Sequence, residues 1–296
     1  MTHAPQEWSH SFGRNEQFRI SVANSLEERR RAYEMVYRLY RREGYAEPNP
    51  SRMWLSFHNL LPETVTLVVH RADELVGTLT VVFDAPPGLP CARVYGRELG
   101  ALRDTERRPA EIISLGVVDG NRRDSRDILV KLFNYVYLVS WHLRGATDFV
   151  ITVNPHHADY YRKTLLFETW GPERTYGKVG GAPAVLLRLN LEIPDRAVRE
   201  PDAAELRERT HYRFFHTREE EREVLPGLEE TLAPMSEEEF QLFAMDETDL
   251  WDHADPREKS CLAQHYFTAL LRLGGDLDTF ANVPSMMPRL MLQKVS

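Results

Sequence analysis

The chain has 296 residues, of which 42% are hydrophobic and 28% are charged; this composition is typical of a soluble globular protein, and the absence of any apolar run of about 18 residues excludes a membrane-spanning helix. Residues 195–296 contain 22 acidic and 12 basic residues, whereas residues 1–194 carry a net charge of only +2. The first part is therefore too weakly basic to indicate nucleic acid binding, and the charge asymmetry predicts a domain boundary near Pro194.

Hydrophobic periodicity and turn signals predict a mixture of strands and helices. In chain order we expect a flexible N-terminal tail (1–17), a strand (18–22), a helix (25–44), a short helical piece (53–61), a β-hairpin (64–70 and 75–83), a strand (111–118), a helix (124–144), a strand (149–153), a helix starting at 154, and two last strands (167–170 and 184–191). Ser25 and Glu28 form a capping box, and Pro155 after Asn154 favours a helix start. The order predicts the α/β (α+β) class, with helices on the faces of a mixed β-sheet.

Several familiar catalytic and metal-binding motifs are absent from the sequence. It contains no Gly-x-Ser-x-Gly, His-Glu-x-x-His, Walker loop or Cys-x-x-Cys, so serine hydrolase, zinc protease, NTPase and thiol redox functions have no support. The two cysteines, Cys91 and Cys261, cannot form a disulfide framework or a four-cysteine zinc site. Together with a polar start that lacks an apolar signal region, they lead us to expect a cytoplasmic protein without a metal.

Five short segments, taken in order, resemble one family. They are residues 36–40 (VYRLY) followed by Gly44 and Tyr45, residues 59–64 (NLLPET), residues 77–79 (GTL), residues 111–117 (EIISLGV), and residues 154–163 (NPHHADYYRK) followed by Phe167. Together these segments resemble the N-acyl amino acid synthases, which are relatives of the acyl-homoserine lactone synthases within the GNAT acyltransferase superfamily. The resemblance extends over about residues 19–191, so residues 18–194 are expected to form a GNAT-like N-acyltransferase domain.

The resemblance implies both a fold and a reaction. Two central strands of a GNAT-like sheet are expected to splay apart in a V and to hold an acyl thioester, usually that of an acyl carrier protein. The amine of an amino acid attacks the thioester carbonyl, giving an N-acyl amino acid with a long fatty chain. No permanently bound cofactor is implied, because acyl-phosphopantetheine enters as a substrate. The partners are then the carrier protein and the amino acid, without nucleic acid.

Matched positions suggest which residues would take part. A glutamate at the position of Glu111 would serve as base or relay, and the tyrosine at 161 would protonate the leaving sulfur. Backbone N–H groups of the strand containing Ser114, Leu115 and Gly116 would meet the oxyanion. Each position also has a structural interpretation: Glu111 as a solvent-facing carboxylate at the start of the strand, and Tyr161 as a core residue.

Two further matched positions lie at the start of the helix after residue 153. Asn154 and His157 belong to the matched motif and are candidates for substrate contact. Asn154 is also well placed to cap the helix, since proline follows it. The neighbouring His156 diverges from His157 on a helix, so the two do not form a metal pair.

The donor site departs from the usual GNAT pattern. GNAT enzymes that use coenzyme A tend to carry a (Gln/Arg)-x-x-Gly-x-(Gly/Ala) loop, whose backbone N–H groups hold the pyrophosphate. Here the matching stretch is residues 122–127 (RRDSRD), where Ser125 and Asp127 replace the small residues. This disfavours coenzyme A but allows Arg122, Arg123 and Arg126 to bind a pantetheine phosphate or an acidic carrier protein. Their structural interpretation is a solvated helix start.

The resemblance is silent on residues 195–296, which we expect to form an acidic, helical C-terminal region. Ser236 and Glu239 form a capping box, and Pro256 can open another helix. The apolar end, residues 283–292, could pack against the rest of the chain, border the acyl site, or form a homo-oligomer interface. Two other functions stay open at this point: an acyl-homoserine lactone synthase, and a non-catalytic module that binds an acyl chain or its carrier.

Overall fold

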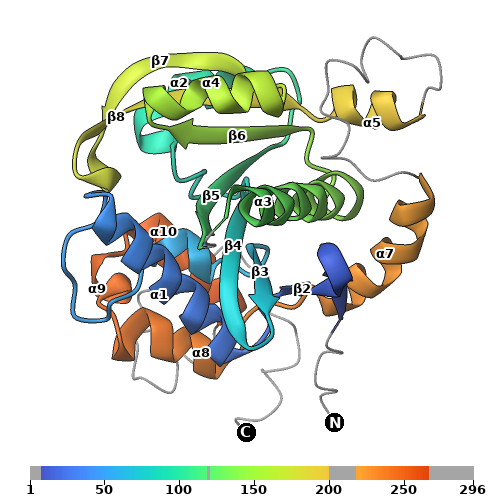
Figure 1. The fold of residues 1–296 in the computed structure, drawn as a ribbon. Helices are drawn as coiled ribbons and strands as arrows, with labels where there is room; N and C mark the ends of the chain where they lie inside the picture. The colour runs from blue at the N-terminus through green and yellow to red at the C-terminus, as the bar shows by residue number, and fades with distance from the viewer. Residues whose placement is uncertain (1–7, 119–120, 200–217, 267–296) are drawn as a thin grey trace, which may run out of the picture. The chain divides into compact units, whose positions relative to one another are not determined.

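The computed structural model describes residues 8–118, 121–199 and 218–266, and the chain divides after Met235 into two compact units. The first unit contains every strand among the described residues (Figure 1). Its elements are β1 (Ser9–Phe12), β2 (Phe18–Val22), α1 (Leu26–Arg42), β3 (Val65–Arg71), β4 (Glu74–Phe83), α2 (Ala92–Arg103), β5 (Pro109–Val117), α3 (Arg122–Tyr137), β6 (Asp148–Val153), α4 (Pro155–Thr164), β7 (Glu168–Tyr176), β8 (Ala182–Asn190), α5 (Glu192–Arg199) and α7 (Arg218–Thr231).

The strands form one mixed sheet in the order β1-β2-β3-β4-β5-β6-β8-β7. Every neighbouring pair is antiparallel except β5 and β6, which run parallel in the centre. The predicted mixed sheet with flanking helices is therefore confirmed. Parallel neighbours need a crossover connection, and α3 supplies it between β5 and β6.

Helices cover both faces of the central strands, and two glycines show how closely they approach. A Cβ atom on Gly77 of β4 would lie 2.6 Å from Cγ2 of Ile128 in α3. A Cβ atom on Gly116 of β5 would lie 2.7 Å from Cδ1 of Leu39 in α1. Because Gly77 pairs with Val117, the residue next to Gly116, and adjacent strand residues face opposite ways, α1 and α3 lie on opposite faces (Figure 1).

The central parallel strands separate soon after they begin to pair. Their register covers only Pro109–Glu111 of β5 against Asp148–Val150 of β6, although both strands continue beyond these residues. On its other side, β5 carries an irregularity. Between Thr78 and Thr80, one residue of β4 stands opposite two residues of β5, Ser114 and Leu115, which is the arrangement of a β-bulge. The splay and the bulge therefore occur in the same strand.

A buried ion cluster holds the closed end of the splay. Asp148, the first residue of β6, is fully buried and accepts hydrogen bonds from Nε of Arg107 and Nε of Arg188, both at 2.7 Å. The Thr147 hydroxyl also donates to it at 2.6 Å. Arg107 precedes β5 and Arg188 lies in β8, so one carboxylate links three strands where β5 and β6 meet.

Several sequence-based expectations differ from the structure. Part of the N-terminal tail expected at residues 1–17 is the edge strand β1, because Ser9–Phe12 form a regular antiparallel ladder with β2. Residues 1–7 lie outside the described part. The helix α2 was not predicted, and the helical piece expected at residues 53–61 is only the short 3-10 turn Phe57–Leu60. The boundary expected near Pro194 falls within α5, and the chain divides after Met235 instead.

The second unit is helical in its described part, residues 236–266. It contains α8 (Glu237–Gln241), the π-helical turn Leu242–Asp246, α9 (Leu250–His253) and α10 (Pro256–His265). The capping box predicted at Ser236 is present, since its hydroxyl accepts the N–H of Glu239 at 3.1 Å. The rings of Phe240 and Tyr266 stack at 4.2 Å within this unit. The apolar segment 283–292 lies outside the described residues.

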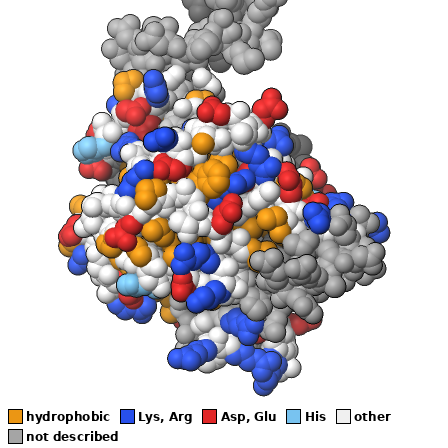
Figure 2. Space-filling model, turned by 90° about the horizontal axis from the view of Figure 1, so that it is seen from above, with side chains coloured by type: hydrophobic (Ala, Val, Ile, Leu, Met, Phe, Trp, Pro, Cys, Tyr) orange, Lys and Arg blue, Asp and Glu red, His pale blue; other side chains and the backbone are white. Residues whose placement is uncertain are grey.

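The surface of the described residues is mixed in character. None of the helices in the described ranges combines the length and the apolar composition that crossing a membrane requires. On the face shown in Figure 2, acidic and basic side chains are interspersed with exposed hydrophobic groups, so no single charge dominates it.

The Asp148 cluster gives a stability prediction. Asp148→Ala should lower the free energy of unfolding by about 3–5 kcal/mol, because it removes the partner of two arginines in a buried site. Equilibrium denaturation of the full chain measures this. As a control, Glu168→Ala removes the exposed carboxylate that lies 3.2 Å from Nη1 of the same Arg188, and should cost about 1 kcal/mol or less. If both variants lost the same free energy of unfolding, the buried cluster would contribute no more to stability than an exposed ion pair.

Candidate active site

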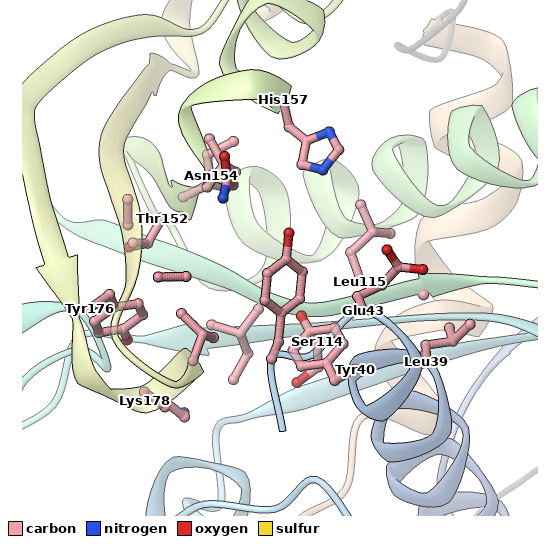
Figure 3. A pocket seen from close by; sticks show the side chains of 18 of the residues that line it. Leu39, Tyr40, Glu43, Ser114, Leu115, Thr152, Asn154, His157, Tyr176 and Lys178 are labelled. Atoms are coloured by element: carbon pink, nitrogen blue, oxygen red, sulfur yellow. The ribbon is translucent and has the colours of Figure 1, made fainter. Parts of the chain in front are cut away.

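A cavity of about 340 Å³ opens where β5 and β6 diverge, within the size range of small-molecule sites. Its wall comes from β5 and β6, the C-terminal end of α1 with the following loop, α4, and the β7–β8 hairpin (Figure 3). The predicted residues Glu111, Ser114, Leu115, Gly116, Asn154, His157 and Tyr161 all line this cavity.

Glu111 is the buried carboxyl group of the cavity, with only 1% of its surface exposed. Its Oε2 accepts the backbone N–H of Cys91 at 2.8 Å, at the residue that precedes the first turn of α2. Burial raises the pKa of Glu111 to about 7, although the Cys91 hydrogen bonds and the charge of Lys178 act in the opposite direction. A carboxyl group in this range can exchange protons at neutral pH, and the solvent-facing interpretation of Glu111 is wrong.

The bulge changes the backbone of β5 at the cavity wall. Ser114 has a φ of 53°, in the left-handed region that residues other than glycine rarely adopt. Its hydroxyl is buried and has no hydrogen-bond partner among the residues that the structure describes. A bulge also leaves an extra residue outside the regular ladder. Backbone groups near Ser114 and Leu115 can therefore form hydrogen bonds with a molecule bound in the cavity.

Phenol groups form much of the remaining polar wall. Tyr161 packs edge-on against Phe133 and Phe167, and burial raises its pKa well above the ordinary value. Burial also raises the pKa of Tyr40 to about 12, with Tyr45 contributing. Both phenols therefore keep their protons at neutral pH. Tyr160, by contrast, does not line the cavity and is 41% exposed.

The start of α4 contributes Asn154 and His157 to the cavity wall (Figure 3). The side chain of Asn154 accepts the backbone N–H of His156 at 3.2 Å, so the capping interpretation is confirmed while the residue also lines the cavity. His157 is exposed at the edge of the same wall. Asn154 therefore both caps the helix and lines the cavity.

The cavity contains two basic side chains that the sequence analysis did not select. Arg42 lies 3.2 Å from the carboxylate of Glu43 at the end of α1. Lys178 comes from the turn between β7 and β8, and its Nζ lies 5.9 Å from the centre of the Trp54 ring. Within the described ranges, no three His, Cys, Asp or Glu side chains are grouped so that they could hold a metal ion.

The predicted donor arginines lie outside the cavity. Arg122, Arg123 and Arg126 are exposed in the first turns of α3. The connection from β5 to α3 is residues 118–121, of which 119 and 120 lie outside the described part. The N-terminus of α3 already has its own partners. Asn121 accepts the N–H of Asp124 at 2.8 Å, and the Asp124 carboxylate lies 3.2 Å from Nη2 of Arg71.

Comparison with known proteins identifies the family. A family described as N-acyl amino acid synthase FeeM matches residues 31–190, more than half of the chain. No curated protein matches. The structure of FeeM, an N-acyl amino acid synthase from uncultured soil microbes, is 22% identical with a TM-score of 0.51, covering 65% of this chain and 94% of that one.

Two acyl-homoserine lactone synthases are also similar in structure. LasI is 14% identical with a TM-score of 0.44, covering 59% of this chain and 90% of its own. The CoA-dependent synthase MesI is 15% identical with a TM-score of 0.43, covering 65% and 94%. The family match, together with the mixed sheet, places the chain plainly: it belongs to the FeeM family of N-acyl amino acid synthases and is an acyltransferase with a GNAT-like fold.

Proposed function

We propose that the protein transfers a long-chain fatty acyl group from the phosphopantetheine thioester of an acyl carrier protein to the α-amine of an amino acid. The product is an N-acyl amino acid. One observation carries this proposal: a buried carboxyl group with a pKa of about 7 shares the cavity of the splay with a bulged strand and a buried phenol. These are the groups that aminolysis of a thioester requires.

Glu111 removes the proton from the attacking amine. A protonated amine has no lone pair for attack, so a base must accept its proton directly or through one water. The nitrogen then bonds to the thioester carbonyl carbon, and the carbonyl oxygen becomes an oxyanion. Because the pKa of Glu111 is about 7, the carboxylate is strong enough to accept a proton and is substantially ionised at neutral pH.

The bulge in β5 and the phenol of Tyr161 stabilise the two negative charges that form during the reaction, the oxyanion and the leaving thiolate. A backbone N–H near Ser114 or Leu115 stabilises the oxyanion, and one such donor contributes roughly 3–4 kcal/mol to the transition state in other enzymes. When the intermediate collapses, the carbon–sulfur bond breaks and the thiolate takes a proton. Tyr161, which stays protonated in its buried position, supplies that proton and later regains one from solvent.

The N-terminus of α3 supports the donor assignment. A coenzyme A pyrophosphate would need free backbone N–H groups there, but Asn121 caps the helix and Asp124 brings a negative charge to its first turn. A carrier protein needs no pyrophosphate site. Its acidic surface or its single phosphate can instead bind the exposed Arg122, Arg123 and Arg126.

The product test distinguishes the alternatives. Purified full-length protein is incubated with acyl carrier protein loaded with long-chain acyl groups and with all proteinogenic amino acids, and the product is identified by mass spectrometry. We expect a free-acid N-acyl amino acid. A lactone product would favour an acyl-homoserine lactone synthase, and a retained acyl chain without turnover would favour a non-catalytic module.

The role of Glu111 predicts both a loss of rate and a pH profile. In the wild-type protein, kcat/KM should rise as the pH rises through about 7, because only the deprotonated carboxylate accepts a proton. Glu111→Gln should lower kcat by roughly 10²–10⁴-fold and abolish this rise. Steady-state rates across pH measure both effects.

A matched control separates catalysis from folding. Glu63 is exposed and does not line the cavity, so Glu63→Gln makes the same chemical change and should leave the rate and the profile unaltered. Glutamine at 111 retains an oxygen for the Cys91 N–H, so the thermal melting of Glu111→Gln should resemble that of wild type. Activity within about threefold of wild type would remove Glu111 from the mechanism.

The donor assignment predicts a salt-dependent preference for the carrier protein over acyl-coenzyme A. Reversal of Arg122, Arg123 and Arg126 to glutamate should raise the KM for the acyl carrier protein, because the reversed charges repel an acidic partner. In wild type, that KM should increase with ionic strength, since the screening length falls to about 8 Å at 0.15 M salt.

The matched control reverses three exposed arginines elsewhere, Arg14, Arg19 and Arg97, which gives the same change in net charge. This control should leave the KM for the carrier protein close to that of wild type. If acyl-coenzyme A is used as well as the carrier protein, independently of salt, the donor assignment is wrong.

A further inference from the structure

The β7–β8 hairpin places one lysine at the cavity wall. Lys178 is the middle residue of the 3-10 turn Gly177–Val179, and the chain returns into β8 through Gly180 and Gly181, both with positive φ. The Lys178 Nζ lies over the Trp54 ring at 5.9 Å from its centre, which is within the range of a cation–π interaction. The tight turn and the ring together hold the ammonium beside the cavity.

In the part of the chain that the structure describes, the charge of Lys178 has no direct counterion. Among the described residues, no carboxylate lies within 4.0 Å of its Nζ, whereas the other basic residue of the cavity wall, Arg42, is paired with Glu43. Burial lowers the pKa of Lys178, and the charge of Glu111, which is partly protonated near pH 7, opposes this shift. Arg93 adds further positive potential. This end of the cavity is therefore suited to a bound anion.

The direction of β5 assigns the two ends of the cavity to the two substrates. The strand runs from Glu111 to Val117, and the chain then continues to α3 and the arginines assigned to the donor. Lys178 lies at the other end, next to Tyr176, whereas Leu115 and Glu43 lie across the cavity (Figure 3). The acceptor thus enters at the end that contains both Lys178 and Glu111.

We propose that Lys178 binds the α-carboxylate of the amino-acid acceptor and thereby sets the position of its α-amine at Glu111. This assignment rests on the proposed function and names the residue that would select free α-amino acids over amines that lack a carboxylate. The amine and the carboxylate share one carbon atom, so an anchored carboxylate confines the amine to the neighbourhood of the base.

The test compares an amino acid with its own α-amide. The amino acid is the one that gives most product in the acyl-transfer assay above, and the amide differs from it only in lacking the negative charge. Lys178→Met should raise the KM for the amino acid by roughly 10- to 100-fold, the range expected for a lost charge-assisted hydrogen bond. The KM for the amide should not change, and Lys178→Arg should restore most of the selectivity.

A matched lysine controls for the loss of a cation–π contact and of a positive charge. Lys259 lies over the Trp251 ring at 5.6 Å in the second unit, so Lys259→Met should leave both KM values unchanged. Calorimetric titration with the N-acyl amino acid and with its amide measures the same selectivity without turnover.

The outcomes separate this inference from the proposed function. If Lys178→Met changes the KM of both acceptors equally, or lowers kcat for both without changing selectivity, Lys178 acts on Glu111 or on folding and the carboxylate assignment is wrong. If wild type prefers the amide, the assignment also fails while acyl transfer stands. If wild type acylates neither acceptor, the proposed function fails and this inference falls with it.

Discussion

The structure depends on the carboxylate of Asp148, which binds Arg107 and Arg188 where β5, β6 and β8 meet. One arginine just before β5 and one in β8 converge on this buried group, so the strands cannot shift in register there without leaving a charge unpaired. Beyond this point β5 and β6 share only a short parallel ladder and then diverge. The cavity therefore forms because β5 and β6 are held together by the Asp148 cluster at their N-terminal ends and are unpaired with each other at their C-terminal ends.

Much of the fold could be predicted because its signals are local. The predicted caps at Ser25, Asn154 and Ser236 all form, and Asn121 forms a further cap that was not predicted. The helix α2 was missed because its sequence contains Gly96 and Gly100, which disfavour a helix. What stabilises it is distant in sequence: its Tyr95 hydroxyl donates to the carbonyl of Ala184 at 2.7 Å. The strand β1 was missed for a related reason, since its polar residues gain their conformation by pairing with β2.

The candidate site could be predicted only where a strand or helix carried a matched motif. Glu111, Ser114 and Asn154 lie on such segments, and the fold brings them to one cavity. Lys178 lies in a hairpin turn with no chemical signature, and only the tertiary structure places it beside Trp54. Cys91 shows another limit: its contribution is a backbone N–H donated to Glu111, which no side-chain pattern could reveal.

The bulge in β5 also has a consequence for how this strand can change during evolution. Before the bulge, the odd-numbered residues Glu111 and Ile113 face the side covered by α1. After the bulge, the even-numbered Gly116 faces that side, because the extra residue reverses the alternation. If β5 kept its length but lost the bulge, regular alternation would turn the side chain of Val117 towards α1, where even a Cβ on Gly116 would lie 2.7 Å from Cδ1 of Leu39. The bulge therefore keeps glycine, and not valine, against α1. The length of the strand and the bulge can change only together, because a strand shorter by one residue keeps Gly116 on this side only if the bulge is lost as well.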